Sequence, residues 1–317
     1  MARVFITRPM TEAVATRAVG EFGADIRTQT TPLTKDEMVA ALQDYELVVP
    51  TLGDLFSAEV FAEVPTPRCT LLANFGVGYN HIDVAAARAA GVEVTNTPGA
   101  VTDATADIAL TLMLMTARRA GEGERLLRSG AWQGWHPTQM LGMHLTGKRL
   151  GVVGLGRIGD AIARRAHFGF GMEIAYVARS PKTTAYPSER ATDLMALAAS
   201  VDVLVLAVPG GGDTRHLINA DVLAAMQPSA LLINIARGEV VDEAALIAAL
   251  DAGQIAGAGL DVYEFEPNAP EALRKMEQVT LLPHLGTATE EVRSAMGHMA
   301  LDNLAAYLAG RELPNRV

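Results

Sequence analysis

Gly154-Leu155-Gly156-Arg157-Ile158-Gly159 decides the fold of this chain. Residues 148–153 before it have the apolar character of a strand, and residues 160–168 after it are typical of a helix. In this setting the first glycine permits a tight turn, the second lets a pyrophosphate approach the backbone, and the third lets the helix pack on the strand. The stretch therefore predicts a dinucleotide site in which Gly154, Gly156, Arg157, Ile158 and Gly159 contact the cofactor at a helix N-terminus.

The end of the next strand indicates which dinucleotide is bound. A site for NAD has an Asp or Glu about 20 residues after the glycines, where it binds the ribose 2′-hydroxyl. Here the strand 172–177 ends in Ala178-Arg179-Ser180, with Lys182 close behind and no carboxylate. A guanidinium and a hydroxyl suit a 2′-phosphate, so we expect NADP(H) to be preferred and NAD(H) to be possible. The alternative is that Arg179 is an ordinary surface arginine.

Composition excludes several classes of protein. The chain has 317 residues, enough for two domains, and a net charge of −10 with no run of basic residues, which argues against nucleic acid as a partner. Its one cysteine, Cys69, excludes an internal disulfide and suits a reducing compartment. The N-terminus reads as a strand rather than a signal peptide, and no apolar run reaches membrane-spanning length. We therefore expect a cytoplasmic protein that does not contact a membrane.

Strand and helix signals alternate along the chain and predict an α/β fold. The long helix expected at 103–119 would cross from one domain to the other, and 130–145 is irregular. Because the fingerprint lies in mid-chain, we expect the dinucleotide domain to be inserted into the first domain, with an amphipathic helix at 289–308 returning to it. The other expected strands are 3–7, 47–50, 70–74, 92–96, 202–208, 230–236, 256–262 and 279–282, and the other helices are 11–22, 34–42, 81–90 and 242–251.

Three ionisable residues follow predicted strands beyond the fingerprint: Arg237, Glu266 and His284. In an open α/β sheet, ligands bind outside the carboxyl ends of the strands, so these side chains can reach one crevice. An imidazolium can donate a proton near neutral pH, a carboxylate beside it favours its charged form, and an arginine can bind a carboxylate and polarise a carbonyl. Each residue alone could be structural. Together they predict reduction of a carbonyl by a nicotinamide cofactor.

The chain resembles the D-isomer-specific 2-hydroxyacid dehydrogenase family over nearly its whole length. The resemblance implies that Arg237 binds substrate, that Glu266 supports the histidine and that His284 is the acid/base. Glu266 is chosen over Glu264 because it precedes a proline. The loop Val77-Gly78 would hold the substrate carboxylate through its N–H groups. The matching pieces are Asn74-Phe75-Gly76-Val77-Gly78-Tyr79-Asn80-His81-Ile82-Asp83, the Gly154 fingerprint, Asn234-Ile235-Ala236-Arg237-Gly238, Gly259-Leu260-Asp261-Val262 with Glu266-Pro267, and Leu282-Pro283-His284-Leu285-Gly286.

The same resemblance implies a flavodoxin-like substrate domain, residues 1–100 and 287–317, and a Rossmann domain, residues 101–286. The Rossmann domain would include a linking helix and a dimerisation segment, 101–146, in a homodimer. Asp261 would lie near the nicotinamide, although it could equally cap a helix or turn. The further cofactor contacts implied are Thr105, Val208, Pro209, Thr214, Ile235, Ala236, His284 and Gly286.

Residues 131–137 and the following Leu141-Gly142 resemble the glyoxylate and hydroxypyruvate reductase branch of the family. Trp135 would reach the partner subunit's active site, or else serve as an interface or core tryptophan. Leu52 would line a small substrate pocket. With NADPH as cofactor, the expected direction is reduction of a small 2-oxo acid. The histidines show no metal spacing, so we expect no catalytic metal.

Other functions remain open from the sequence. A phosphoglycerate dehydrogenase would need additional basic groups for the substrate phosphate. A formate dehydrogenase would need extra polar residues around a very small substrate, and none is evident. The transcriptional corepressors of this family, which sense dinucleotides and bind peptides, can retain the same trio of residues. Turnover of a 2-oxo acid would distinguish an enzyme from such a binding protein.

Overall fold

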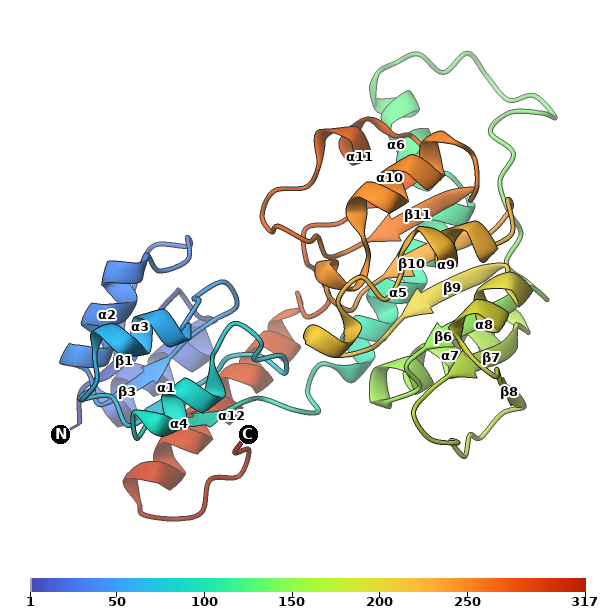
Figure 1. The fold of residues 1–317 in the computed structure, drawn as a ribbon. Helices are drawn as coiled ribbons and strands as arrows, with labels where there is room; N and C mark the ends of the chain where they lie inside the picture. Colours follow the sequence, from blue (N-terminus) through green and yellow to red (C-terminus); the bar gives the residue numbers. More distant parts are fainter. Residues whose placement is uncertain (1) are drawn as a thin grey trace. The chain divides into compact units, whose positions relative to one another are not determined.

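The computed structural model describes residues 2–317 and divides into two compact α/β units. One unit contains the chain through Val101 together with Thr287–Val317, and the other is Thr102–Gly286. Each unit has a parallel sheet covered by helices (Figure 1), so the predicted fold class is confirmed. None of the described helices is long and apolar enough to cross a membrane.

The smaller unit has five parallel strands in the order β2-β1-β3-β4-β5, the flavodoxin-like order. The two-residue β2, which the sequence pattern did not reveal, completes this sheet. The carboxyl ends of β1, β3 and β4 lead into Thr7, Thr51 and Asn74, respectively. The strands are β1 Val4–Ile6, β2 Asp25–Ile26, β3 Leu47–Val49, β4 Leu71–Ala73 and β5 Glu93–Thr95, and the helices are α1 Glu12–Phe22, α2 Lys35–Asp44, α3 Ala58–Glu63 and α4 Val84–Ala89.

The C-terminal helix α12, Glu290–Leu308, packs against α1 and β4 of this unit. A Cβ at Gly297 would lie 2.5 Å from a methyl carbon of Val14, so glycine allows the two helices to approach closely. The chain end is fixed as well, because the N–H of Val317 donates to the carbonyl of Val94 at 3.1 Å. The last 31 residues of the chain are thereby part of the same core as the first strands.

The larger unit has seven parallel strands in the order β12-β11-β10-β9-β6-β7-β8. Alternate residues of its central strands face opposite layers: Leu232 packs with α8, α9 and α10, and Ile233 packs with α5 and α7. Burial on both faces explains the continuous apolar runs of these strands. The strands are β6 Arg149–Val153, β7 Glu173–Val177, β8 Ser188–Arg190, β9 Val203–Leu206, β10 Leu231–Asn234, β11 Gly257–Leu260 and β12 Val279–Leu281, and the helices are α5 Thr102–Ala117, α6 Ala120–Arg128, α7 Arg157–Phe170, α8 Leu194–Ser200, α9 Ala220–Ala225, α10 Glu243–Asp251 and α11 Glu271–Lys275.

Two expectations about helices were wrong. The helix expected at 103–119 does not cross between domains, since α5 lies wholly in the larger unit and packs on α7, β10 and β11. It also ends at Ala117, and Arg119 adopts a left-handed φ of 53° before α6 begins. The helix expected at 81–90 begins later, at Val84, because the side chain of Asp83 caps it by accepting from the N–H of Ala86 at 2.9 Å.

Candidate active site

The glycine turn has the geometry that a bound pyrophosphate needs. Gly154 has a φ of +94°, and a Cβ there would lie 2.7 Å from the carbonyl oxygen of Ala207. A Cβ at Gly159 would lie 2.2 Å from the carbonyl oxygen of Gly154, so this glycine lets α7 pack on β6. Nothing lies within 4 Å of the corresponding position at Gly156, which begins α7 without a side-chain cap. The open space and uncapped N–H groups therefore fit a dinucleotide phosphate.

This turn lies where the order of strands reverses. The next strand in the chain, β7, pairs with β6 on one side, and β9 pairs with β6 on the other. Ligands in open α/β sheets bind at this kind of switch point. Val208 lines it, because its Cγ1 lies 2.7 Å from the position of a Cβ at Gly154.

Basic side chains gather at the end of β7. Arg179 and Ser180 are exposed in the loop that follows this strand. The guanidinium of Arg190, on the neighbouring strand β8, donates to the carbonyl of Ala178 at 3.0 Å and lies beside the same corner. The loop is held in place by Tyr176, whose hydroxyl accepts from the N–H of Lys182 at 2.9 Å. Sequence reasoning missed Arg190, because β8 was not recognised as a neighbour of β7.

Arg237 leaves the end of β10 as a largely buried guanidinium that pairs with no carboxylate in the described part of the chain. Its Nη1 donates to the carbonyl of Ala236 at 2.6 Å, and its Nε is buried with no hydrogen-bond partner among the described residues. Burial lowers the pKa of Arg237, while the charges of Glu266 and Glu239 favour the charged form. Arginine remains protonated at neutral pH even so. The side chain therefore offers an incompletely satisfied positive charge, which suits an anionic ligand.

His284 and Glu266 form a hydrogen-bonded pair. Nδ1 of His284 lies 2.9 Å from Oε2 of Glu266, and both side chains are 30% exposed. Burial by itself would raise the pKa of Glu266, but the hydrogen bond and charge of His284 outweigh burial and lower that pKa. The carboxylate at Nδ1 orients the imidazole and leaves Nε2 as the nitrogen that can exchange a proton with a ligand.

Asp261 holds the backbone of His284 in an unusual conformation. The φ of His284 is 54°, in the left-handed region that costs a residue with a side chain on the order of 1–3 kcal/mol. Three successive N–H groups bind Asp261: that of His284 at its carbonyl (2.9 Å), and those of Leu285 (2.6 Å) and Gly286 (2.8 Å) at its carboxylate. Burial raises the pKa of Asp261. Its visible role is to anchor this turn, which was the alternative interpretation from the sequence.

Glu264 belongs to a different cluster from Glu266. Its carboxylate lies 2.8 Å from Nε2 of His216 and 2.8 Å from Nη2 of Arg215. The N–H of Glu264 donates to the buried carboxylate of Glu243 at 2.9 Å. Glu264 therefore anchors the loop that carries Glu266, while Glu266 itself meets the histidine.

In the smaller unit, the loop after β4 presents free N–H groups. Asn74 Nδ2 donates to the carbonyls of Gly76 (3.1 Å) and Gly78 (3.0 Å), and Asn96 Nδ2 donates to the carbonyl of Val77 (2.8 Å). With these carbonyls engaged, the N–H groups of Val77 and Gly78 make no hydrogen bond within residues 2–317. Adjacent free N–H groups of this kind form an anion-binding nest.

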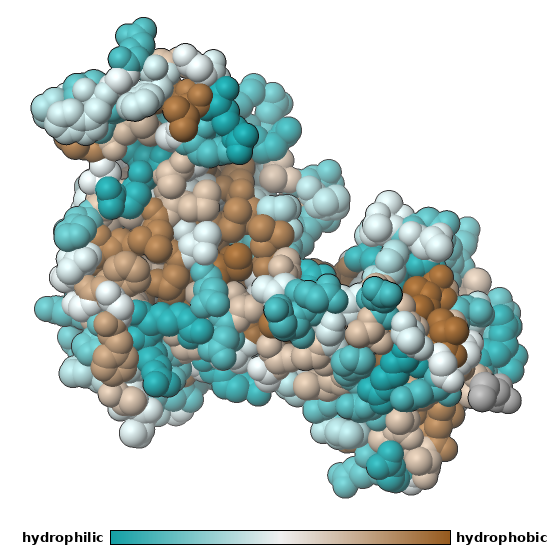
Figure 2. Space-filling model, turned by 180° about the vertical axis from the view of Figure 1, so that it is seen from behind, coloured by the Kyte–Doolittle hydropathy of each residue, from teal (hydrophilic) through white to brown (hydrophobic). Residues whose placement is uncertain are grey.

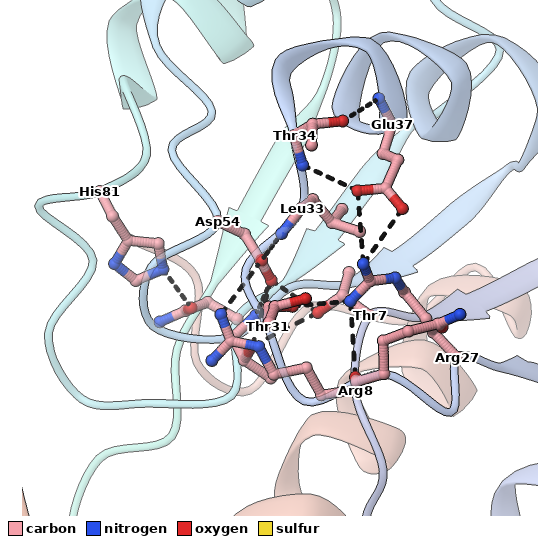
Figure 3. Close-up of polar contacts among 12 residues, drawn as sticks. Thr7, Arg8, Arg27, Thr31, Leu33, Thr34, Glu37, Asp54 and His81 are labelled. Carbon is pink, nitrogen blue, oxygen red and sulfur yellow. Dashed lines mark hydrogen bonds and ion pairs between the residues drawn. The ribbon is translucent and has the colours of Figure 1, made fainter. Parts of the chain in front are cut away.

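The loop carrying Leu52 is anchored by the buried carboxylate of Asp54 (Figure 3). This carboxylate accepts from the hydroxyl of Thr7 at 2.6 Å and from the N–H groups of Thr51 at 2.8 Å and Leu33 at 2.9 Å. Arg8 approaches it at 3.5 Å. Leu52 is half-buried and lies in the chain between Thr51 and Asp54, which the hydrogen bond between them holds in place. Sequence reasoning missed Asp54. Its position two residues after Leu52, the predicted pocket residue, was the only sign of its role.

The remaining residues predicted to contact cofactor or substrate lie in varied environments. Thr105 donates to the carbonyl of Gly286 at 3.1 Å, and Thr214 donates to the carbonyl of Pro209 at 2.7 Å. Ile235 and Ala236 are buried. Trp135 is 78% exposed, which excludes the interpretation as a core tryptophan. No group of three His, Cys, Asp or Glu that could hold a metal ion occurs within the part of the chain that the structure describes.

Comparison with known proteins gives the family of this site. The family model described as D-isomer specific 2-hydroxyacid dehydrogenase, NAD binding domain, matches residues 110–286. The chain belongs to this family. The predicted resemblance is confirmed, and the chain is an oxidoreductase that uses a nicotinamide dinucleotide.

Individual relatives match over nearly the whole chain. A glyoxylate reductase from Pyrococcus furiosus is 42% identical, covering 99% of this chain and 95% of the relative. A glycerate dehydrogenase from Hyphomicrobium methylovorum is 35% identical, covering 98% and 97%. The solved structure of an NADPH-dependent glyoxylate/hydroxypyruvate reductase from Sinorhizobium meliloti, in complex with NADP and malonate, has a TM-score of 0.88 at 38% identity, covering 100% of this chain and 96% of that one.

Proposed function

We propose that this protein reduces small 2-oxo acids, glyoxylate and hydroxypyruvate, to 2-hydroxy acids of the D series with NADPH. The observation that carries this proposal is the guanidinium of Arg237, whose buried Nε has no hydrogen-bond partner among the described residues, in the same unit as the His284–Glu266 pair. These groups match the two demands of the reaction, a positive charge for an anionic substrate and a proton donor for its carbonyl oxygen. The glyoxylate reductases among the relatives support the choice of substrate.

Each side chain has a distinct role in this proposal. Arg237 binds the substrate carboxylate and polarises the adjacent carbonyl. The free N–H groups of Val77 and Gly78 form a nest that suits a carboxylate. Leu52 lines the pocket. His284 gives a proton to the carbonyl oxygen as negative charge develops there, and Glu266 stabilises the imidazolium and fixes its orientation. The reduced nicotinamide, when bound, supplies the hydride.

The test is a direct assay of turnover. Purified protein should consume NADPH absorbance when glyoxylate or hydroxypyruvate is added, and the product should be the D isomer by chiral chromatography. A panel of other 2-oxo acids, including larger ones, should give lower kcat/KM. Absence of turnover with every 2-oxo acid and either cofactor would refute the proposal and favour a dinucleotide-sensing protein.

We propose that Arg179 and Ser180 give the preference for NADPH by binding its 2′-phosphate. Replacement Arg179→Ala should raise KM for NADPH by about tenfold to a hundredfold, since it removes a charge-assisted contact to phosphate. KM for NADH should change little, because NADH carries no 2′-phosphate. Steady-state kinetics with both cofactors measure this difference.

The matched control is Arg164→Ala, which removes another exposed guanidinium, from α7 of the same unit. It should alter KM for the two cofactors equally. A wild-type kcat/KM that is much higher with NADH than with NADPH would show that the assignment of the cofactor is wrong.

We also propose a homodimer in which α6 and the segment up to residue 146 form the interface. No residue of α6 is buried within the single chain, and Leu127, Trp135 and Leu141 are 63%, 78% and 67% exposed. Apolar side chains lie on the surface of the larger unit (Figure 2), where a second copy could cover them. Sedimentation equilibrium should give twice the mass of the chain, and Trp135→Ser with Leu141→Ser should weaken the dimer. A monomer at micromolar concentration would contradict this proposal.

A further inference from the structure

Gly210 lies against Arg237 in a glycine-rich loop after β9. A Cβ at Gly210 would lie 2.8 Å from Cγ of Arg237 and 2.7 Å from Oε1 of Glu239. The φ of Gly210 is outside the left-handed region, so glycine is needed here for space and not for backbone conformation. At Gly212, two residues later in the chain, a Cβ would have no atom within 4 Å. The loop therefore contains one crowded glycine and one open glycine with ordinary backbone geometry.

Glu239 connects this loop to the arginine. Its Oε1 accepts from the N–H of Gly211 at 2.9 Å, and its carbonyl accepts from the N–H of His216 at 2.7 Å. Its carboxylate is near enough to Arg237 to favour the charged guanidinium, although the two side chains form no ion pair. Glu239 thus lies at the contact between the loop and Arg237 without satisfying the charge of Arg237.

We infer that Glu239 is a positioning residue for Arg237 and that Gly210 provides the space in which the two side chains meet. By binding the N–H of Gly211, the carboxylate of Glu239 fixes the loop that lies against Arg237. Its negative charge also weakens the electrostatic field of the guanidinium at the substrate. The guanidinium is thereby held in one orientation yet remains available to an anionic substrate. This inference rests on the proposed role of Arg237 in binding the substrate carboxylate.

Two substitutions separate the effect of the negative charge of Glu239 from the effect of its hydrogen bond to Gly211. Glu239→Gln keeps an oxygen that can accept from Gly211 but removes the negative charge, so the field of Arg237 at the substrate increases. KM for glyoxylate should then fall by about threefold to tenfold, as expected for removing a like charge near a bound carboxylate at an effective dielectric constant of about 20. Glu239→Ala loses the anchor as well and should raise KM for glyoxylate. A merely structural role would not give effects of opposite sign.

The space at Gly210 is tested by a matched pair of variants. Gly210→Ala should displace Arg237 and raise KM for glyoxylate by about tenfold or more, because small misplacements of a binding group are costly. Gly212→Ala adds the same methyl group in open space of the same loop and should leave KM for glyoxylate unchanged. The dissociation constant of NADPH, measured by fluorescence, should stay within twofold in both variants, which shows that the dinucleotide site is intact.

The outcomes distinguish this inference from the proposed function. If Arg237→Ala leaves KM for glyoxylate unchanged, the proposed role of Arg237 is wrong. If Arg237→Ala raises KM but Gly210→Ala equals Gly212→Ala, or Glu239→Gln does not lower KM, the positioning role of Glu239 and Gly210 is overturned while the proposed function stands.

Discussion

Replacement of His284 by alanine is expected to lower kcat for glyoxylate reduction by about a thousandfold, within the usual range for loss of a general acid. The imidazole pairs with Glu266 at 2.9 Å, and its other nitrogen, which makes no hydrogen bond within residues 2–317, can donate to a carbonyl oxygen. Single-turnover absorbance measurements with saturating NADPH report this step directly. KM for NADPH should change little, since the glycine turn that holds the phosphates is not affected.

Glu266→Gln is the graded companion to this variant. The amide can still accept a hydrogen bond from Nδ1 but no longer stabilises an imidazolium by charge, so kcat should fall less than in His284→Ala. A His284→Ala variant that keeps its thermal stability and more than a tenth of wild-type kcat would refute the assignment of the proton donor.

The pH dependence of wild-type activity follows from the same pair. Because the pKa of Glu266 lies below its usual value, this carboxylate remains ionised throughout the range of pH 5–8, about where histidine titrates. Protonation of Glu266 should therefore reduce kcat/KM only below the usual titration range of a carboxylate, which a pH profile of the wild-type enzyme measures.

Replacement of Arg237 by alanine is expected to lower kcat/KM for glyoxylate by about 30-fold to several thousandfold. This range corresponds to the cost of about 2–5 kcal/mol for removing one partner of a buried charged contact. Arg237 pairs with no carboxylate among residues 2–317, so little stabilisation from an internal ion pair is lost with it. Both KM and kcat should be affected, since the guanidinium binds the carboxylate and also polarises the carbonyl.

Arg237→Lys provides the control for charge alone. It keeps the positive charge but lacks the planar fork that binds a carboxylate at two points, so kcat/KM should remain well below that of the wild type. Full activity of Arg237→Lys would show that a point charge is sufficient. Wild-type kcat/KM in Arg237→Ala, with normal NADPH binding, would exclude this residue from the substrate site.

The glycine turn was the part of the site that local sequence determined most completely. Two of its three glycines have a steric requirement within a few residues or one neighbouring strand: positive φ and close approach to Ala207 at Gly154, and close helix packing at Gly159. At Gly156 the chain leaves open space instead. Such requirements leave a direct imprint on residue type and spacing. The strand-end positions of Arg237, Glu266 and His284 could be predicted for a similar reason, because parallel strands place their carboxyl ends at one edge.

The local sequence pattern could not predict which groups the side chains contact. Nothing in the sequence around Asp261 shows that its carboxylate binds the backbone of Leu285 and Gly286, more than 20 residues away. Likewise, the short strands β2 and β8 carry little periodicity of their own, and pairing with β1 and β7 defines them. Missing β8 concealed Arg190 beside the predicted phosphate corner.

The sequence by itself thus determined an α/β chain with an inserted dinucleotide fold and the residues that could reduce a carbonyl, because these depend on strand and helix periodicity and on backbone sterics near each glycine. Only the tertiary structure decided how those residues are held: the pairing of Glu266 with His284, the left-handed turn anchored by Asp261, and the space at Gly210 that Arg237 and Glu239 share. These features depend on distances between segments far apart in the chain, which packing sets and local sequence does not encode.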